Sequence, residues 1–323
     1  MCAEREKSLK HICVIIVTFN GERWIGGALD SLKNDRSGCC VTVVDNASTD
    51  STAAIVRENY PEVRLICLSQ NAGFGKGNNV GISDAIHSDA EYIFLLNQDA
   101  YVTETSIVQL IEFLDSHPEF DIATPLHCSP DLSTVDIKTQ RNYLCQYAME
   151  YISDACIGRV KDHYPIKGIN AAAWMVRSSA FKKVGGFDPL FFMYGEDDDL
   201  IHRFNFHECR FALVPYARIV HLRQSPPSKS VSYWESILKM RDRVRASMLV
   251  DIKTPGTSVY LMISLILSQG FVRPIAVFIV DRDEKMLLAH LLAGIKLSAE
   301  LPEIRRHNKQ CESEGFHFLS KNE

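Results

Sequence analysis

Short apolar runs of strand length alternate with segments of helical periodicity through the first half of the chain. The runs, which are rich in β-branched residues, are His11–Asn20, Cys39–Asn46, Val63–Ser69 and Glu91–Asn97. The intervening segments, with apolar residues three or four apart, are Gly21–Leu32, Ser48 to about Asn59, Val80–Ile86 and Thr105–Ser116. Strand–helix units of this length build a right-handed parallel sheet with buried strands. The sequence therefore predicts an α/β fold.

The second half of the chain is less regular. Residues 126–165 carry scattered polar and aromatic positions and predict loops and short strands. The expected strands are Ile166–Arg177, Phe211–Val214 and Ala217–Leu222, and the expected helices are Ser178–Val184, Glu196–His207 and Ser230–Asp251. Because no repeat or low-complexity linker divides the chain, we expect one main domain over residues 1–250 and a helical extension over residues 251–323.

Two apolar stretches mark this extension. Tyr260–Val280 is close to the ~20 residues that a spanning helix needs, but polar residues, an arginine and a proline interrupt it at residues 269–274. Met286–Leu297 is the second stretch. The pair is compatible with helices packed on the main domain, a contact between two copies, helices lying on a membrane surface, or a true span. The interruption favours the arrangements that do not cross a membrane.

The composition is that of an ordinary globular protein. Hydrophobic residues make up 46% and charged residues 23% of the 323 positions, which excludes a disordered chain and a collagen. The net charge is −5, whereas non-specific nucleic-acid binding needs a basic surface, so no nucleic-acid partner is expected. The ten cysteines form no CxxC pair, which argues against a zinc ribbon or a thioredoxin-type site.

The cysteines and the N-terminus also bear on the cellular compartment. Cys13 and Cys67 lie inside apolar runs and are expected to be buried free thiols. The N-terminal MCAEREKSLK is charged and lacks the apolar core of a signal peptide. These two observations together predict a reducing, cytoplasmic location.

Polar residues cluster where the predicted strands of the first half end. The clusters are Thr18–Asn20, Asp45–Asn46, Asn71 onward and Asn97–Asp99. Ligands of parallel α/β sheets bind outside the carboxyl ends of the strands, so these residues are expected to share one site. Asp99, together with oxygens of a bound diphosphate, would suit Mg2+ or Mn2+. A lone aspartate after a strand also serves as a turn or cap residue, and this alternative stays open.

Four consecutive carboxylates mark the predicted start of a later helix. They are Glu196, Asp197, Asp198 and Asp199. A helix N-terminus favours anions, so compensation of the helix dipole is one explanation. Adjacent acids repel one another, however, and successive helical residues point about 100° apart, so at most two are expected to face a cleft. Arg203, four residues after Asp199, can hold one acid while another acts as a general base.

Several other candidates also have a purely structural explanation. Asp45 and Asp50 can accept hydrogen bonds from a base or a ribose, whereas Asp50 can also cap a helix. The glycine-rich segment Asn71–Asn79 either lets the backbone approach a ligand or forms a tight turn. His221 ends a short strand and is either a ligand or a structural histidine.

Together the motifs occur in the order found in one enzyme family. They are VTFN, DNASTD, NAGFGKGNN, LNQDA, GGFDPLFFMYGEDDDLIHR and VHLRQSPPS. Over roughly residues 11–250 the chain resembles glycosyltransferase family two, of GT-A fold, and its rhamnosyltransferase-like bacterial branch. The resemblance implies a metal-dependent, inverting enzyme that transfers a sugar from a nucleotide diphosphate donor to an acceptor hydroxyl.

Matched motif by motif, the resemblance implies roles for single residues. The donor would lie against Thr18, Asn20, Asp45, Asp50, Asn71, Gly73, Asn78 and Asn97. Asp99 and His221 would hold the divalent metal, Mg2+ or Mn2+, and Asp197 would be the general base. Asn97 stands where the family motif has an acid, and Asp198 stands where an apolar residue is usual. Glu196 and Asp198 therefore remain catalytic candidates beside Asp197.

The resemblance leaves the substrates open. dTDP-rhamnose and UDP-hexoses are both compatible donors. A cell-surface polysaccharide or a lipid-linked acceptor fits the apolar extension, with peripheral contact at the inner face of the membrane, and a homo-oligomer is also compatible. A dinucleotide-dependent dehydrogenase is a rival, but its GxGxxG pattern fails at Asn78. A non-catalytic nucleotide-sugar-binding protein of the same fold is the other rival, although competent residues stand at the metal, base and nucleotide positions.

Overall fold

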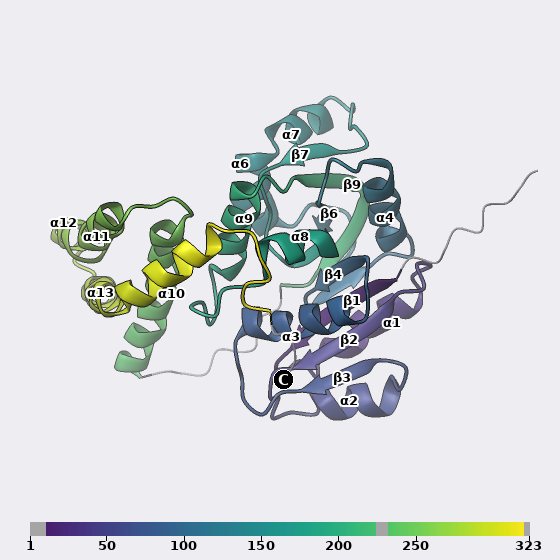
Figure 1. Cartoon of the computed structure of the whole chain (residues 1–323), viewed down its shortest axis with the longest axis horizontal. Coiled ribbons are helices and arrows are strands. Elements are labelled where there is room, and N and C mark those ends of the chain that lie inside the picture. The colour runs from purple at the N-terminus through teal and green to yellow at the C-terminus, as the bar shows by residue number, and fades with distance from the viewer. Residues whose placement is uncertain (1–10, 224–231, 320–323) are drawn as a thin grey trace, which may run out of the picture.

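A computed structural model describes residues 11–223 and 232–319 of the chain. At its centre lies one mixed, nine-stranded sheet with helices on both faces (Figure 1). The strands are β1 (Ile12–Thr18), β2 (Cys40–Asp45), β3 (Arg64–Cys67), β4 (Tyr92–Leu96), β5 (Ala100–Val102), β6 (Ile122–Cys128), β7 (Tyr164–Ile166), β8 (Ala173–Arg177) and β9 (Phe211–His221). Their order is β3-β2-β1-β4-β8-β6-β9-β5, and β7 pairs with β9.

The first half of the sheet is the predicted parallel unit. β1 pairs in parallel with β2 and β4, and β2 pairs in parallel with β3. Every residue of β1 is buried, which explains its uninterrupted apolar sequence. The α/β fold is therefore confirmed. Parallel pairing does not extend through the second half, because β8 runs antiparallel to both β4 and β6.

Helices cover the sheet and continue into a separate C-terminal layer. Those before residue 233 are α1 (Ile25–Lys33), α2 (Thr52–Asn59), α3 (Phe74–His87), α4 (Ser106–Ser116), α5 (Ile137–Thr139), α6 (Cys145–Tyr147), α7 (Met149–Cys156), α8 (Ser178–Val184) and α9 (Glu196–Phe206), with a π-helical turn η1 (Gln140–Leu144). The C-terminal unit comprises α10 (Tyr233–Lys253), α11 (Val259–Leu267), a π-helical turn η2 (Ser268–Val272), α12 (Arg273–Asp281) and α13 (Glu284–Cys311).

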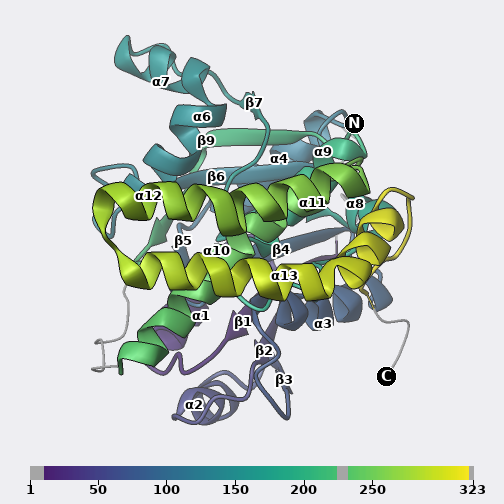
Figure 2. The ribbon, with the colours of Figure 1, turned by 90° about the vertical axis from the view of Figure 1, so that its left-hand side faces the viewer.

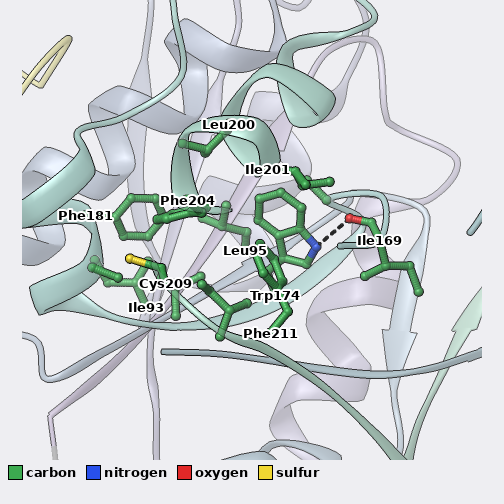
Figure 3. Packing of buried hydrophobic residues seen from close by; sticks show 14 of the residues in the cluster. Ile93, Leu95, Ile169, Trp174, Phe181, Leu200, Ile201, Phe204, Cys209 and Phe211 are labelled. Atoms are coloured by element: carbon green, nitrogen blue, oxygen red, sulfur yellow. Dashed lines mark hydrogen bonds between the residues drawn. The ribbon is translucent and has the colours of Figure 1, made fainter. Parts of the chain in front are cut away.

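Hydrophobic side chains pack on both faces of the sheet. On the face opposite α1 and α4, Trp174 of β8 lies fully buried between Phe204 and Phe211 (Figure 3). Its indole N–H donates to the Ile169 carbonyl oxygen at 3.0 Å, so burial leaves this donor paired. Truncating such an aromatic costs about 3–5 kcal/mol. Phe204 belongs to α9, which also carries Glu196–Asp199, here called the acid run. This packing therefore holds the helix of the acid run against the sheet.

The glycine-rich segment after β3 is a shorter turn than predicted. α3 already begins at Phe74, so the residues up to Asn79 form its first turns. Gly73 remains in the turn with φ of +88°, and a Cβ there would lie 2.2 Å from the Phe192 carbonyl oxygen. This backbone conformation and the close approach of residue 192 both require glycine.

The prediction of buried thiols is half right. Cys13 is buried, whereas Cys67 is exposed because β3 is an edge strand of the sheet. The cysteines within the described ranges are free thiols, and Cys2 lies outside those ranges with the rest of the N-terminal segment MCAEREKSLK.

The segment between β6 and β7 is helical, and the prediction of loops and short strands is wrong there. Residues 137–156 form the succession α5–η1–α6–α7, in which the longest helix has eight residues. Helices this short offer too few turns for a hydrophobic period to be recognised. The single strand predicted over Ile166–Arg177 is likewise divided, because β7 ends at its first residue and β8 starts at Ala173.

The two short strands predicted before residue 222 are one strand. β9 runs through Pro215 without interruption. Its register with β6 shifts between Pro125 and Leu126, and the shift skips the residues around Pro215. A proline has no N–H to donate to the ladder, and such an irregularity accommodates it.

The C-terminal unit lies beside α9, away from the first strands (Figure 1), and α11–α12 and α13 run side by side in it (Figure 2). The interruption of the apolar run at residues 269–274 does not end the helix, because α11 continues through η2 into α12. A Cβ on Gly270 would lie 2.8 Å from the Cα of Gly294, so this glycine lets α13 approach closely. Within the described ranges, Val259–Asp281 is the one helix long and apolar enough to cross a membrane.

Candidate active site

Side-chain hydrogen bonds tie together the carboxyl ends of β1 and β4. Thr18 Oγ1 donates to Gln98 Oε1 at 2.6 Å, and the Phe19 N–H donates to the same oxygen at 3.1 Å. Thr18 also lies opposite Asp45 in the β1–β2 ladder. The structure therefore brings these predicted residues to one edge of the sheet, where ligands of such folds bind. Gln98, which locks this edge, was missed by the sequence analysis.

Asn46 connects the end of β2 to the turn before α3. Its Oδ1 accepts from the Ala72 N–H at 2.8 Å, and its Nδ2 donates to Asn71 Oδ1 at 3.0 Å and to the Gly73 carbonyl oxygen at 3.1 Å. Asn71 and Gly73 thus lie beside the end of β2. Asn46, a buried residue that the sequence analysis did not single out, holds them there.

Asp45 has one engaged and one unengaged oxygen. Oδ2 accepts from the Ser48 N–H at 3.2 Å, whereas Oδ1 is buried without a hydrogen-bond partner in the described part of the chain. An unpaired buried acceptor costs about 1–3 kcal/mol. A donor group on a ligand would offset that cost, so this atom marks a binding position.

Asn20 and Asp50 lie in the loops next to this edge. Asn20 Oδ1 accepts from the Thr49 N–H at 2.8 Å. Asp50 accepts from the backbone N–H groups of Thr52 at 3.0 Å and Glu22 at 3.2 Å. Both side chains therefore fasten the loop after β1 to the loop after β2, and their contact with a donor stays a prediction.

Asp99 and His221 meet where β5 and β9 pair. The ladder places Ala100 opposite His221, and Asp99 Oδ1 lies 3.5 Å from His221 Nε2. A carboxylate oxygen and an imidazole nitrogen that converge in this way suit Mn2+ and related cations. The described ranges contain no group of three or more His, Cys, Asp or Glu residues that could hold a metal. A cation between these two side chains would therefore need further ligands from a bound donor.

The acid run borders a cavity of about 390 Å³, here called the acid cavity. Three of its acids, Glu196, Asp197 and Asp198, line this cavity together with Asn97 and Asn170, so one acid more than expected faces it. Glu196 Oε2, Asn97 Oδ1 and Asn170 Oδ1 are buried and have no hydrogen-bond partner among the described residues. Unpaired oxygens gathered around one cavity are typical of a site that binds polar groups.

The three acids of the cavity differ in how readily they lose a proton. Asp197 Oδ1 accepts from the Asp198 N–H at 3.0 Å and Oδ2 accepts from the Ala171 N–H at 3.4 Å. Burial raises the pKa of Asp197, and these two hydrogen bonds oppose that shift. Burial and the charge of Asp197 raise the pKa of Glu196 to about 8 and that of Asp198 to about 7. Two backbone N–H groups thus favour the ionised form of Asp197.

Asp199, the fourth acid, is held in a buried ionic cluster that comprises Asp188, Asp199, Arg203, Lys253 and His307. Asp199 Oδ2 accepts from Arg203 Nε at 2.9 Å, and Oδ1 accepts from Lys253 Nζ at 2.8 Å. Lys253 Nζ also lies 2.9 Å from Asp188, which is hydrogen-bonded to His307 Nδ1 at 2.8 Å. The predicted pairing of Arg203 with Asp199 is confirmed, and the C-terminal unit supplies two further partners.

Arg223 is a cation of the cavity that the sequence analysis missed. Its guanidinium lies 2.9 Å from Asp136 and donates to Thr139 Oγ1 at 3.1 Å, and the residue lines the cavity with the acid run. The available signal was its place in the VHLR motif, two residues after His221.

Tyr143 and Asn170 also line the cavity without any earlier signal in the sequence. Burial and the charges of Asp197 and Asp198 raise the pKa of the Tyr143 phenol, so it remains protonated beside the acids. Tyr143 comes from η1, in the helical segment that was predicted to be loops. The error in secondary structure there concealed one wall of the site.

The predicted donor residues do not all reach this cavity. Asn97 lines it, whereas the residues at the ends of β1 and β2 lie at the neighbouring sheet edge. Asn78 is buried in α3, where its Nδ2 donates to the Phe74 carbonyl oxygen at 3.0 Å, so its side chain serves the helix. Residues 224–228 of the VHLRQSPPS motif lie outside the described residues.

Several characterised glycosyltransferases are similar to this chain in sequence. The N-acetylglucosaminyl-diphospho-decaprenol L-rhamnosyltransferase of Mycobacterium tuberculosis is 28% identical over 56% of this chain and 66% of its own length, just under two thirds. Rhamnosyltransferase WbbL of Escherichia coli K12 is 25% identical over 65% of this chain and 83% of its own length. The low-salt glycan biosynthesis hexosyltransferase Agl10 of Haloferax volcanii is 22% identical over 83% and 85%.

Solved structures share the fold. S. aureus TarS 1-349 in complex with UDP-GlcNAc matches with a TM-score of 0.56 and 17% identity, over 94% of this chain and 89% of that one. The mannosyltransferase PcManGT from Pyrobaculum calidifontis, in complex with GDP-Man and Mn2+, matches with a TM-score of 0.53 and 16% identity, over 93% and 84%. At such identities the likeness establishes the fold alone, which is GT-A.

Family-level sequence profiles cover both halves of the site. The profile described as glycosyl transferase family 2 matches residues 13–185, which include β1–β4 and the Asn97–Asp99 motif. A profile described as the N-terminal domain of galactosyltransferase matches residues 155–225, which include the acid run and His221. The first match extends over more than half of the chain, and the protein therefore belongs to glycosyl transferase family 2.

Proposed function

We propose that this protein transfers a sugar from a nucleotide diphosphate donor to an acceptor hydroxyl, with inversion at the anomeric carbon. One observation carries the proposal: Asn97 at the end of β4 and the acid run at the start of α9 border a single cavity whose buried oxygens have no partner among the described residues. The family and the activities named for its relatives, rhamnosyl and hexosyl transfer, support the same reaction class.

Asp197 is the proposed general base. In a single displacement the acceptor oxygen forms a bond to the anomeric carbon, the bond from that carbon to the diphosphate breaks, and the hydroxyl proton passes to a carboxylate. The reacting carbon becomes oxocarbenium-like, as in glycoside hydrolysis. Asp197 accepts from two backbone N–H groups that favour its carboxylate form, which is the form that can take the proton. Asp198, whose pKa is about 7, is the second candidate.

Asp99 and His221 are the proposed ligands of a divalent cation, Mg2+ or Mn2+. Their ligand atoms lie 3.5 Å apart, and the Asp99 side chain is 20% exposed, so it can be reached from the donor side. Oxygens of the donor diphosphate would complete the coordination. A bound cation stabilises the negative charge that develops on the leaving diphosphate. The neutral Asn97 adds no charge of its own, which makes the diphosphate oxygens more important.

The nucleoside is proposed to lie along the ends of β1 and β2. Asp45 Oδ1, buried and unpaired among the described residues, can accept the imide N–H that thymine and uracil share. Thr18, Asn20, Asp50 and Asn71 surround this position. The geometry is thus compatible with dTDP-rhamnose and with a UDP-hexose.

The acceptor is proposed to be a glycan or lipid-linked sugar of cell-surface polysaccharide synthesis, met at the cytoplasmic face of the membrane. The support is the name of the mycobacterial relative, which specifies a decaprenol-linked acceptor, together with the apolar helix Val259–Asp281 of this chain.

A donor screen by thermal shift in the presence of Mn2+ tests the proposal. A donor that binds the folded protein raises Tm by mass action. We expect dTDP-rhamnose or a UDP-hexose to raise Tm, and Asp45→Asn to reduce that shift. Transfer is then measured with the donor that binds. If no nucleotide sugar raises Tm, the proposal is wrong; if one binds but is never transferred, the protein is the non-catalytic binding rival.

A further inference from the structure

The outer side of α11–η2–α12 is an unusually apolar surface. Between Val259 and Val280 the only charged side chain is Arg273. Six large apolar side chains, here called the outer stripe, are 41% to 82% exposed: Tyr260, Ile263, Leu267, Val272, Ile275 and Ile279. Scattered exposed apolar residues need no explanation, but a continuous line of six marks an interaction surface.

The spacing of the outer stripe follows the helix geometry. Successive members are three or four residues apart, as neighbours on one helix face must be, except that Val272 comes five residues after Leu267. That interval coincides with η2, a π-helical turn, which accommodates an extra residue. The π turn therefore keeps both halves of the outer stripe on the same side of the segment.

The opposite side of the same segment is anchored to the protein. Met262, Ile266, Gly270 and Pro274, each four residues after the last, are the buried positions. Met262 and Ile266 belong to the hydrophobic cluster formed with α10 and α13, and Gly270 contacts Gly294 of α13. A transmembrane orientation would remove the helix from these contacts. The segment is therefore placed to lie along a surface with the outer stripe facing it.

The size of the outer stripe argues against a second copy of the chain as its partner. A helix of 23 residues is about 34 Å long, and side chains make it about 10 Å wide, so it offers roughly 340 Å². A stable protein–protein interface needs about 800 Å² on each partner. A lipid surface has no such minimum, because each apolar side chain that enters it contributes separately.

The ends of the outer stripe carry side chains suited to a lipid–water boundary. Tyr260 stands at its start, and Tyr233 and Trp234 are exposed at the start of α10, which lies near its other end. Lys285, which follows α12, lies 4.8 Å from the Tyr233 ring, so the end of α12 lies close to the start of α10. Amphipathic aromatic rings and long basic side chains can keep their polar tips in water while their apolar parts contact lipid.

The same helices lead back to the acid cavity. A groove of about 550 Å³ between α10, α12 and α13 is lined by Arg243, Arg273, Asp251 and Asp283 together with apolar and other polar side chains. The Arg243 guanidinium lies 5.4 Å from the Tyr194 ring, and Tyr194 lines the cavity that holds Asp197. The groove on these helices is thus linked to the proposed acceptor site through Arg243 and Tyr194.

We propose that the outer stripe rests on a lipid bilayer, with α11–α12 lying in the plane of the membrane and the C-terminal unit placed between the bilayer and the acid cavity. This orientation would present a lipid-linked acceptor to the cavity while its chain stays in the membrane. The presentation of the acceptor rests on the proposed function, whereas the membrane contact does not.

Flotation with vesicles, without any substrate, tests the membrane contact. The full chain is mixed with vesicles of pure phosphatidylcholine, or of phosphatidylcholine and phosphatidylglycerol in equal parts. Because the surface is mainly apolar, we expect the wild type to float with both. The double variant Leu267→Glu, Ile279→Glu should reduce the bound fraction by roughly tenfold or more, since charged side chains then meet the lipid. Ile157→Glu, which alters a residue 64% exposed after α7, is the matched control and should float normally.

Several results would overturn the proposal. A wild-type protein that stays at the bottom of the gradient with both vesicles does so, as does a double variant that floats normally. Binding confined to phosphatidylglycerol and abolished by salt would assign the contact to charge instead. Sedimentation of a stripe-dependent dimer that ignores vesicles would assign the surface to a second copy.

Two further measurements distinguish a loss of the fold, or a failure of the proposed function, from a failure of the membrane contact. Equal melting temperatures for the three proteins show that the substitutions leave the fold intact. Transfer to a water-soluble acceptor should survive in the double variant; if the wild type itself shows no transfer, the proposed function fails while the flotation result still stands.

Discussion

Two faces of helix α9 place adjacent aspartates in opposite electrostatic surroundings. Asp198 borders the acid cavity between two other acids, and burial with their charges raises its pKa to about 7. Asp199, the next residue, is 2% exposed and is paired with Arg203 and Lys253. One carboxylate thus exchanges its proton near neutral pH, whereas the other is paired with two buried cations. Partners, rather than residue type, determine which role each acid has.

The difference also separates catalysis from stability within a few residues. In the buried ionic cluster, burial opposes the charge of Asp188, but His307 and Lys253 keep its pKa below the usual range. Around the cavity, buried oxygens of Glu196 and Asn170 have no partner in the described part of the chain. The cluster therefore holds the helix in place, and the cavity leaves polar groups for a ligand to satisfy.

The largest effect is expected from Asp197→Asn, which removes a carboxylate that lines the acid cavity. Loss of the base should lower kcat by roughly ten-thousandfold, while donor binding measured by calorimetry stays within a few-fold. Asp198→Asn is the matched control and should be less severe. If Asp198→Asn causes the greater loss, the base is Asp198 and the assignment of Asp197 is wrong.

Lys253→Met removes one cation of the buried ionic cluster. Two buried carboxylates would then share one cation fewer, so the free energy of unfolding should fall by about 4 kcal/mol in urea denaturation. Lys239→Met removes an exposed pair with Glu235 and should change stability little. An equal, small effect of both substitutions would contradict the structural role of the cluster.

The stability difference between the wild type and Lys253→Met depends on pH with a defined sign. The pKa of Lys253 is raised in the fold by Asp199 and Asp188 against the effect of burial, so its contribution is present at neutral pH and lost as pH rises through the folded value. The lowered pKa of Asp188 gives a contribution that is present above the unfolded pKa of 3.8 and lost as pH falls through the folded value. Wild type and Lys253→Met should therefore differ most at intermediate pH.

Asp99→Ala tests whether Asp99, beside His221 where β5 and β9 pair, is a metal ligand. Removal of one of two protein ligands should weaken the Mn2+-dependent part of donor binding by up to roughly hundredfold, measured by calorimetry with and without Mn2+. Asp162→Ala, at an exposed position before β7, is the control and should have no effect. Donor binding that depends on Mn2+ as before would remove Asp99 from this role.

The smallest effect concerns the stability cost of Glu196. Its pKa of about 8 lies above the ordinary 4.5, so the folded state keeps a proton that the unfolded chain releases between these values. Wild-type stability should therefore fall as pH rises through this window, whereas Glu196→Gln should not, and the variant should gain roughly 1–2 kcal/mol at pH ~9. Urea denaturation across the pH range measures this, and a constant difference would show that the pKa is not raised.

Much of the fold follows from local patterns. The apolar run of β1, the helix Ser178–Val184 and the pairing of Arg203 with Asp199 could all be predicted, because a continuous apolar strand, a helical period and an i,i+4 contact are each set within a few residues. The ordered motifs also placed polar residues at the strand ends and acids at the start of α9. The boundary after residue 250 stays a prediction, although α10 itself runs through that position.

Local patterns could not indicate which of these residues meet. Lys253 lies 54 positions from Asp199, and His307 lies 119 positions from Asp188, yet burial and ion pairing make them one cluster. Tyr143 gained a role because the turn η1 lines the cavity beside the acid run, and Asn170 because the loop between β7 and β8 does so too. Residue types and their short-range spacing were legible in the chain, whereas burial, proton affinity and unpaired polar atoms depend on contacts between distant segments that close only when the molecule folds.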